Sequence, residues 1–274
     1  MLALVPALVL ALAPRPALAQ EGAAVEETVK PWGNEAQVAL VDAAGNSSST
    51  TFAISNRFTY NWTFSELILG AELFRSTTDT RVLTNDAGTV QESVVETIGA
   101  ERYEVTGKYR QNMLGDLFWY GSGAWYRNRP AGIDSRANFT GGVGYRFLEN
   151  ASTLVAGEIG VGVERETPVG LPADTFADGR AYLEIRHEFS DSGSLQVEAE
   201  MLDNLQDTQD LRINGRVAVT SKLTSVFALR VGLDLRYDNQ PAIVIVDGGP
   251  GVPAASFVLD DLDRALSASL VVSF

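Results

Sequence analysis

Residues 262–274 read LDRALSASLVVSF and alternate between apolar and small polar side chains up to the end of the chain. Leu266, Leu270 and Phe274 fall on one face, and Ser267 and Ser269 fall on the other. A period of two residues is that of a β-strand with one apolar face. A strand that stops on a C-terminal aromatic residue is typical of bacterial outer-membrane barrels. We therefore expect Phe274 to be the signal that the barrel assembly machinery reads.

The same two-residue alternation of apolar and polar side chains is present through most of the chain. In the clearest segment Phe227, Val231 and Leu235 lie opposite Arg230 and Asp234, as period-two geometry requires. In all, the pattern predicts twelve strands, near 34–43, 50–60, 63–75, 93–110, 116–127, 135–147, 153–165, 179–190, 194–202, 210–220, 225–237 and 262–274.

A soluble β-sandwich would also alternate, so the connections and the aromatic residues decide between the two fold classes. Some connections are tight, namely Leu148–Ser152, Asp191–Gly193 and Ser221–Thr224, whereas others are long, namely 76–92, 166–178 and 238–261. Aromatic residues gather at strand ends, among them Trp62, Phe118 and Trp119. Short turns at one end, long loops at the other and aromatic girdles are typical of transmembrane barrels. Residues 34–274 are thus predicted to form an all-β, antiparallel, up-and-down transmembrane barrel of about twelve strands.

The beginning of the chain resembles an export signal. Residues 2–13 are almost purely apolar, and Ala17-Leu18-Ala19 forms a small-x-small cleavage site. No basic residue precedes the apolar run, which departs from the usual pattern. We expect residues 1–19 to be a signal peptide cleaved near Ala19, residues 20–33 to be a periplasmic tail, and the mature protein to lie in the outer membrane.

The composition excludes several classes of protein. With 35 acidic and 21 basic residues the net charge is −14, which disfavours nucleic acid as a partner because phosphates need a basic surface. The chain has no cysteine, so neither a lipid anchor nor a disulfide framework is expected. The expected partners are the lipid of the outer membrane and lipopolysaccharide, and no cofactor is predicted.

Several short motifs resemble a known family. Trp32-Gly33-Asn34-Glu35, Gly45-Asn46-Ser47-Ser48-Ser49 and Tyr60-Asn61-Trp62 open the predicted barrel, and Gly141–Arg146 and Tyr237–Pro241 follow later. These stretches resemble the salt-induced outer-membrane proteins, a family defined by a domain of unknown function. The resemblance implies an outer-membrane β-barrel linked to salt or osmotic stress, with no established catalytic residues to carry over.

The polar faces of the strands carry charges of both signs. One interpretation is a charged pore lining that sets ion preference; the other is a salt-bridged lumen that is nearly closed, because neighbouring charges can pair. Twelve strands enclose a bore between that of filled eight-stranded barrels and that of open porins. The lumen-lining candidates are Arg102, Glu104, Lys108, Arg110, Arg136, Arg146, Glu158, Glu184, Arg186, Glu198, Glu200, Arg212, Arg216, Arg230, Asp234 and Arg236.

No motif in the chain points to catalysis or to a metal. His187, the only histidine, shares a face with Leu183 and Ile185. This lipid-facing position is wrong for a base that must face a nucleophile in a pocket. Acidic residues crowd two loops but match no defined calcium loop, so we expect no metal site; they are Asp203, Asp207, Asp210, Asp247, Asp260, Asp261 and Asp263.

The last long connection is unusual because Pro241–Val246 is apolar and precedes Gly248-Gly249-Pro250-Gly251. It could be a lid in the mouth of the barrel, although a hairpin that extends the wall is slightly favoured. The predicted function is a narrow passive channel for small solutes or ions. The alternative is a non-conducting structural or surface-interaction barrel that acts through its extracellular loops. A hydrolase with a site at the outer rim is the weakest hypothesis, and the oligomeric state is left open.

Overall fold

The computed structural model describes the backbone of residues 30–43, 47–86, 89–241, 243–246 and 255–274. Side chains are described for the same residues except 41–48, 80–92 and 242–257. Contacts along the chain divide it into Met1–Lys30 and Pro31–Phe274. The predicted signal peptide, residues 20–29 of the predicted tail, Asp247 and the Gly248–Gly251 turn lie outside the described residues, so these predictions stay predictions.

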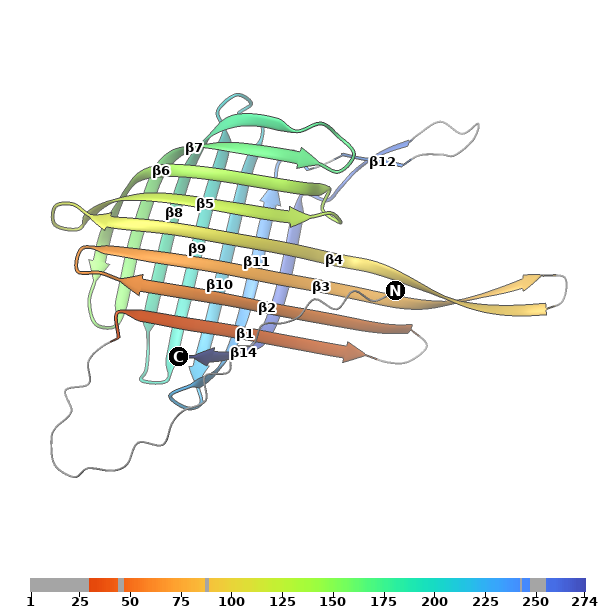
Figure 1. The fold of residues 1–274 in the computed structure, drawn as a ribbon, viewed down its shortest axis with the longest axis horizontal. Helices are drawn as coiled ribbons and strands as arrows, with labels where there is room; N and C mark the ends of the chain where they lie inside the picture. Colours follow the sequence, from red (N-terminus) through yellow and green to blue (C-terminus); the bar gives the residue numbers. More distant parts are fainter. Residues whose placement is uncertain (1–29, 44–46, 87–88, 242, 247–254) are drawn as a thin grey trace. The chain divides into compact units, whose positions relative to one another are not determined.

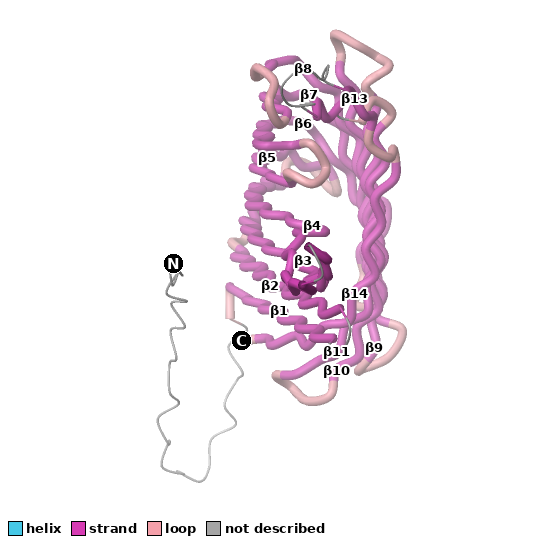
Figure 2. The backbone as a smooth tube through the Cα atoms, turned by 90° about the vertical axis from the view of Figure 1, so that its right-hand side faces the viewer, coloured by secondary structure: helices cyan, strands magenta, loops and turns pink. Residues whose placement is uncertain are grey.

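Twelve antiparallel strands close into a barrel (Figures 1 and 2), which confirms the predicted fold and number of strands. Around the barrel the order is β1-β14-β11-β10-β9-β8-β7-β6-β5-β4-β3-β2, so each strand lies beside its neighbours in sequence. The strands are β1 (Trp32–Ala43), β2 (Ser47–Asn61), β3 (Ser65–Asp86), β4 (Thr89–Asn112), β5 (Leu117–Asn128), β6 (Ile133–Glu149), β7 (Thr153–Pro168), β8 (Asp174–Glu188), β9 (Gly193–Asn204), β10 (Leu211–Lys222), β11 (Phe227–Asp238) and β14 (Leu262–Ser273).

Side-chain alternation decides which face of each strand turns outward. On β6 the side chain of Phe139 is 69% exposed, whereas that of the next residue, Thr140, is buried. On β7 the side chain of Val161 is 65% exposed, whereas that of Glu158 is buried. The outer surface is therefore hydrophobic and the interior polar, the reverse of a soluble barrel. Strands of the near wall cross those of the far wall in Figure 1, as tilted barrel strands do.

The two ends of the barrel differ. One end, called here the terminal end, carries Phe274 and the short turns, such as the one that joins β6 to β7. A row of aromatic rings lines its outer rim. The distances between neighbouring ring centroids are 4.5 Å for Tyr60 and Trp62, 6.3 Å for Trp62 and Tyr109, and 5.5 Å for Tyr109 and Trp119. The opposite end, called the hairpin end, carries the long connections. The predicted asymmetry of the turns is thus present, and the terminal-end rings form part of a girdle.

The largest departure from the predicted strands is at 76–92, which was expected to be a loop. Instead β3 and β4 continue to Asp86 and Thr89 and form a long hairpin that projects from the barrel (Figure 1). The ladder continues across these residues with one irregularity, at Ser76/Thr77. Thr and Val favour strands, but no apolar face marks this segment, so its sequence resembles a loop.

Two short strands, β12 (Ile243–Val246) and β13 (Ala255–Val258), pair in a separate two-stranded sheet. This arrangement agrees with the favoured hairpin interpretation of the last long connection. Among the described residues, no helix is long and apolar enough to cross a membrane.

Candidate functional site in the barrel interior

A buried carboxylate, Glu158 on β7, organises the interior near the middle of the barrel. Its oxygens lie 2.8 Å from Lys108 Nζ, 2.9 Å from Arg110 Nη2 and 2.8 Å from Arg180 Nη1. Glu158 is 3% exposed and Arg110 is 6% exposed. A carboxylate shared by three cations is favourable here because each charge would otherwise be buried without compensation.

Glu184 on β8 extends this network toward the terminal end. Its carboxylate accepts a hydrogen bond of 2.9 Å from Arg110 Nη2 and pairs with Arg186. Arg180 donates from Nε to Glu200 at 2.6 Å. Since Arg110 is on β4 and Glu184 is on β8, their contact spans strands that are not neighbours in the sheet. These side chains therefore meet inside the barrel and fill the sector bounded by β4–β9.

Two aromatic residues of β5, Phe118 and Tyr120, lie flat against β6 and β7 beneath this network. Both are 1% exposed. A methyl group on Gly144 would overlap the Phe118 ring, and one on Gly160 would overlap the Tyr120 hydroxyl. Tyr120 Oη in turn accepts a hydrogen bond from Arg180 at 3.2 Å. The Gly-x-Gly pairs of β6 and β7 are thus crowded barrel positions. The assignment of Phe118 to an aromatic girdle was therefore wrong, since its ring lies inside the barrel. The sequence analysis did not identify Tyr120 as an interior residue.

A second ionic cluster lies in the same sector at the hairpin end. Arg212 Nη1 lies 2.6 Å from Glu164 Oε1, and Arg136 Nη2 lies 2.6 Å from Glu166 Oε2. Glu164 is fully buried. Each arginine also approaches the other's carboxylate, Arg136 at 3.3 Å from Glu164. Arg136 and Arg212 are among the predicted lumen-lining residues.

Ion pairs also bridge the interior from wall to wall. Arg236 on β11 lies 2.8 Å from Glu104 on β4, and Arg216 on β10 lies 3.4 Å from Glu72 on β3. The strands of each pair are separated by several others in the closed sheet. Glu72 also pairs with Arg102 on β4. We call the Arg236–Glu104 and Arg216–Glu72 pairs the cross-barrel bridges; they separate the filled sector from the rest of the interior.

The remaining candidates have local partners. Arg216 also pairs with Asp234 at 2.6 Å, and Arg230 on β11 pairs with Glu35 on β1 at 3.1 Å. At the terminal end Arg146 donates to Asn112 Oδ1 at 2.8 Å. On β9, Glu198 accepts a hydrogen bond of 2.8 Å from Gln196. The structure thus gives every charged candidate a polar partner within the described residues.

The wall opposite the filled sector is lined by small side chains. On the inward face of β1, β2 and β14 many residues are small, as the alternation of exposure along these strands shows. On β10 and β11 small residues stand between charged ones. Ser267 on β14 remains exposed although it faces inward. This small-residue wall comprises Ala39, Ala53, Ser55, Ala218, Ala228, Gly232, Ala265, Ser267 and Ser269.

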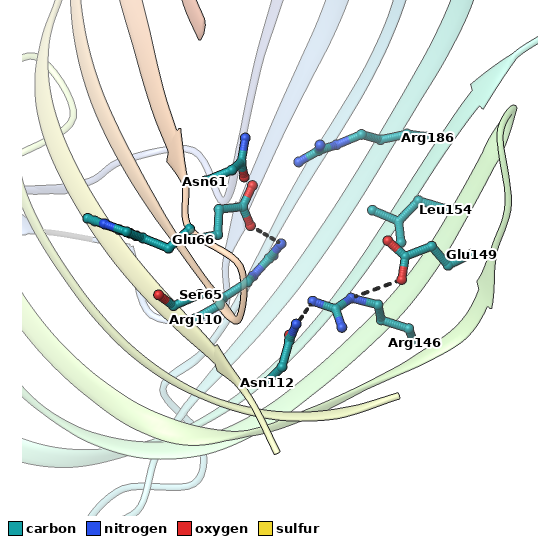
Figure 3. Close-up of a pocket in the computed structure, with 10 residues that line it drawn as sticks. Asn61, Ser65, Glu66, Arg110, Asn112, Arg146, Glu149, Leu154 and Arg186 are labelled. Carbon is teal, nitrogen blue, oxygen red and sulfur yellow. Dashed lines mark hydrogen bonds and ion pairs between the residues drawn. The ribbon is translucent and has the colours of Figure 1, made fainter. Parts of the chain in front are cut away.

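The terminal end contains two hollows that share Arg186. The first, of about 210 Å³, is lined by polar groups that include Glu66, Arg110, Arg146 and Arg186 (Figure 3). Arg186 projects into it from the side opposite Asn61 and Glu66. The second, of about 220 Å³, includes Arg186 and the C-terminal Phe274. Both are large enough for several waters or a small solute.

His187 is not among the residues that line the two hollows. His187 Nδ1 lies 2.9 Å from the Thr153 hydroxyl at the terminal end of β7 and β8. Within the part of the chain that the structure describes, no group of three or more histidine and acidic residues could hold a metal ion. What the interior offers chemically is a hydrated, ion-paired surface.

Solved structures that resemble the chain are membrane barrels. A structure described as the NanC porin is 8% identical with a TM-score of 0.44, and covers 88% of this chain and 97% of its own. The translocator domain of the autotransporter NalP from Neisseria meningitidis is 12% identical with a TM-score of 0.44, and covers 91% and 90%. An anion-selective porin from Comamonas acidovorans is 13% identical with a TM-score of 0.39, and covers 89% and 98%. Likeness at this level says nothing about the solute of this chain.

No curated protein matches the chain. A family model described as a protein of unknown function, DUF481, matches residues 36–244. This match spans most of the barrel, from β1 into β12. The link to salt stress implied by the sequence motifs is not part of that description and stays a prediction. The chain belongs to the DUF481 family of proteins of unknown function.

Proposed function

We propose that this protein is an outer-membrane barrel that forms a narrow passive channel for small solutes or ions. The observation that carries the proposal is the unequal filling of the interior. Large charged and aromatic side chains pair with one another in the sector of β4–β9, whereas the opposite wall is lined by small residues such as Ser267. Where the charged side chains pair on one side, a passage lined by small side chains is left along the other; we call it the lane.

The outer surface supports a location in a membrane. Leu229, Val231 and Leu233 on β11 are all more than a third exposed, and β11 is 12 residues long, close to the roughly 9–11 residues of a transmembrane strand. The aromatic rim marks one interface. By analogy with bacterial barrels, the terminal end with its short turns faces the periplasm and the hairpin end faces outward. A signal peptide cleaved near Ala19 would provide the export that this location requires.

The proposed partners follow from that orientation. Arg127 and Arg165 turn outward at the hairpin end, directly beyond the apolar residues Trp125 and Val163. Their guanidinium groups are placed to meet phosphates of lipopolysaccharide. Phe274, which donates its backbone N–H to the Asn34 carbonyl at 3.0 Å, is proposed as the residue that the assembly machinery recognises. We propose no enzymatic activity, and a role in salt stress rests on the family resemblance of the motifs alone.

The experiment that tests the channel is single-channel recording of the refolded protein in a planar bilayer. The informative variant is Ser267→Trp, because the indole would occupy the lane beside the small-residue wall. The matched control is Ala268→Trp, whose side chain turns toward lipid on the same strand. We expect discrete conductance steps in the native protein and in Ala268→Trp, and a strongly reduced step in Ser267→Trp.

A non-conducting barrel is the second candidate, and the cross-barrel bridges favour it because they tie opposite walls together. Silent bilayers with all three proteins, each folded as judged by heat-resistant β-structure, would rule out the channel. Function would then lie in the β3–β4 and β12–β13 hairpins. Equal conductance in all three proteins would show that ions pass elsewhere than along the small-residue wall.

A further inference from the structure

The seam where the barrel closes is much shorter than any other contact between its strands. β1 and β14 pair only at Glu35↔Ser273, Ala36↔Val272, Gln37↔Val271 and Val38↔Leu270. Other neighbouring strands pair over ten residues or more, as do β4 with β5 and β11 with β14. Figure 1 shows the end of β14, at the label C, beside β1. Closure is therefore confined to the terminal end of the seam.

Beyond Val38 and Leu270 both strands continue without pairing to each other. β1 runs on to Ala43 and pairs with β2 alone, while Leu262–Ser269 of β14 pairs with β11 alone. Continuing the register would place Leu40 opposite Ala268, but the described residues contain no such pair. Leu266, on the outer face of this segment, is 79% exposed. Two strand edges whose backbone groups have no ladder partner among the described residues thus face each other across a gap.

The gap lies at the depth of the apolar band. In the unpaired part of β14 the outward residues Leu266 and Ala268, which follow Arg264, are apolar. The register row through Leu266 continues through Leu233, Val217, Val197 and Ile185. A membrane would therefore surround the unpaired edges on both sides at this level.

Free strand edges cannot face lipid, because each unsatisfied N–H and C=O in hydrocarbon costs several kcal/mol. Such edges persist at membrane depth only where they are buried in protein or line a water-filled space. The inward residues beside them, Gln37, Ser267 and Ser269, are polar, and Ser269 Oγ lies 3.3 Å from Gln37 Oε1. Water from the lane along the small-residue wall can thus reach the edges.

We propose that the unpaired part of the β1–β14 seam is a lateral opening through which a small amphipathic molecule passes between the barrel interior and the outer leaflet. Its inner side is polar, with Ser267 and Ser269, and its outer rim is apolar, with Leu40 and Leu266. A molecule with a polar head and an apolar body is complementary to both. The proposal rests on the hydrated interior of the proposed channel and adds a second exit to it.

The first test measures the access of water to the opening. Because the chain has no cysteine of its own, the labelling rate of a single introduced cysteine can be measured without background. Leu266→Cys places a thiol at the gap, and Leu233→Cys places one at its register partner on β11, in the same apolar row but on a fully paired strand. In lipid nanodiscs, a charged methanethiosulfonate should label Leu266→Cys about tenfold or more faster than Leu233→Cys, since lipid excludes the reagent from the paired wall. Equal rates would overturn the proposal.

The second test measures pairing across the seam. Ala36→Cys with Val272→Cys joins an existing pair, where the Cα atoms of antiparallel neighbours fall in the roughly 4.4–6.8 Å range of disulfides. Leu40→Cys with Ala268→Cys joins positions that would pair only in a closed seam. The first pair should oxidise readily and the second slowly. Equally rapid oxidation would mean that the strands pair fully in the membrane, which contradicts an opening.

The third test addresses the ligand. Dansyl-labelled undecanoic acid should slow the labelling of Leu266→Cys and leave that of Glu149→Cys, at the terminal rim, unchanged. Absence of protection would overturn the assignment of an amphipathic molecule. Conductance of the same variants separates this proposal from the channel: a water-accessible, protected Leu266→Cys in a protein without conductance would support the opening and contradict the axial channel.

Discussion

At the scale of single residues, glycines opposite aromatic rings determine how the filled sector packs. Gly144→Ala puts a methyl group into the Phe118 ring, and overpacking of this kind costs about 1–3 kcal/mol. The control is Gly121→Ala on β5, where an added methyl group meets nothing within 4 Å. We expect urea unfolding in lipid vesicles to show a lower free energy of unfolding for Gly144→Ala only. Equal stabilities would mean that Phe118 does not lie against β6.

The buried carboxylate at the centre of the ionic network gives a second prediction at this scale. Glu158→Gln leaves Lys108, Arg110 and Arg180 without their shared anion, and removing one partner of a buried pair costs about 3–5 kcal/mol. Glu149→Gln also removes a carboxylate that pairs with an arginine, but this carboxylate is 58% exposed, so the loss should stay below about 1 kcal/mol. The comparison is made by unfolding both variants in urea. A small effect of Glu158→Gln would indicate that water screens the network.

Single residues also show which features of the interior could be predicted from the sequence and which could not. Parity along each strand identifies which charges share a face, and all sixteen charged candidates have a polar partner in the structure. Parity cannot identify ion-pair partners such as Arg110 and Glu184, or Arg236 and Glu104. These contacts depend on the curvature of the barrel and on which of its strands face each other across the interior. Phe118 and Tyr120 were missed for a related reason: an aromatic residue suits either face, and only the glycines on β6 and β7 mark the inner one.

At the scale of elements, the β3–β4 hairpin separates into a barrel part and a projecting part. β2 supports β3 only as far as the Ser47↔Thr80 pair, and β5 supports β4 only from Tyr103 onward. Beyond Thr80 the two strands pair only with each other. The projecting part is therefore held by its own ladder, and the closed wall does not depend on it.

This division predicts that the projecting part can be removed. Replacing Arg81–Val94 with an Asn-Gly turn joins Thr80 to Val95, which are already register partners, and Asn-Gly suits a tight hairpin. We expect heat-modifiable migration on gels and the free energy of unfolding to be unchanged. A comparable deletion within Leu67–Leu73, which pairs on both sides, should prevent folding. Loss of folding in the first variant would mean that the hairpin is needed for assembly.

The sequence predicted the elements better than their lengths. All twelve barrel strands were identified because lipid outside and polar groups inside impose a strict alternation on residues at membrane depth. Beyond the membrane that constraint disappears, so Thr77–Thr80 of β3 was assigned to a loop. The short β1–β14 seam was also unpredictable, since both strands have the alternation and length for full pairing. The register between the first strand, β1, and the last strand, β14, depends on how all twelve strands together close the barrel.

At the scale of the whole molecule, the cross-barrel bridges should limit the size and selectivity of the lane. The double variant Glu72→Gln, Glu104→Gln removes both carboxylates of these bridges. Arg102 and Arg236 lose their ion-pair partners, while Arg216 keeps Asp234. Opposite walls then lose their ion pairs and the interior gains two net positive charges. We expect a larger single-channel conductance and, in a salt gradient, a reversal potential shifted toward anion preference, because rings of uncompensated arginine favour anions.

The control for this double variant removes the same charge from the same hairpin but outside the barrel interior. Glu96→Gln with Glu101→Gln changes two β4 carboxylates near Arg75, of which Glu96 is 60% exposed. Its conductance and reversal potential should match those of the native protein. If both double variants shift the reversal potential equally, the selectivity arises from surface charge and not from the bridges. If neither changes the conductance, ions do not pass between the bridged walls, and the bridges are structural ties alone.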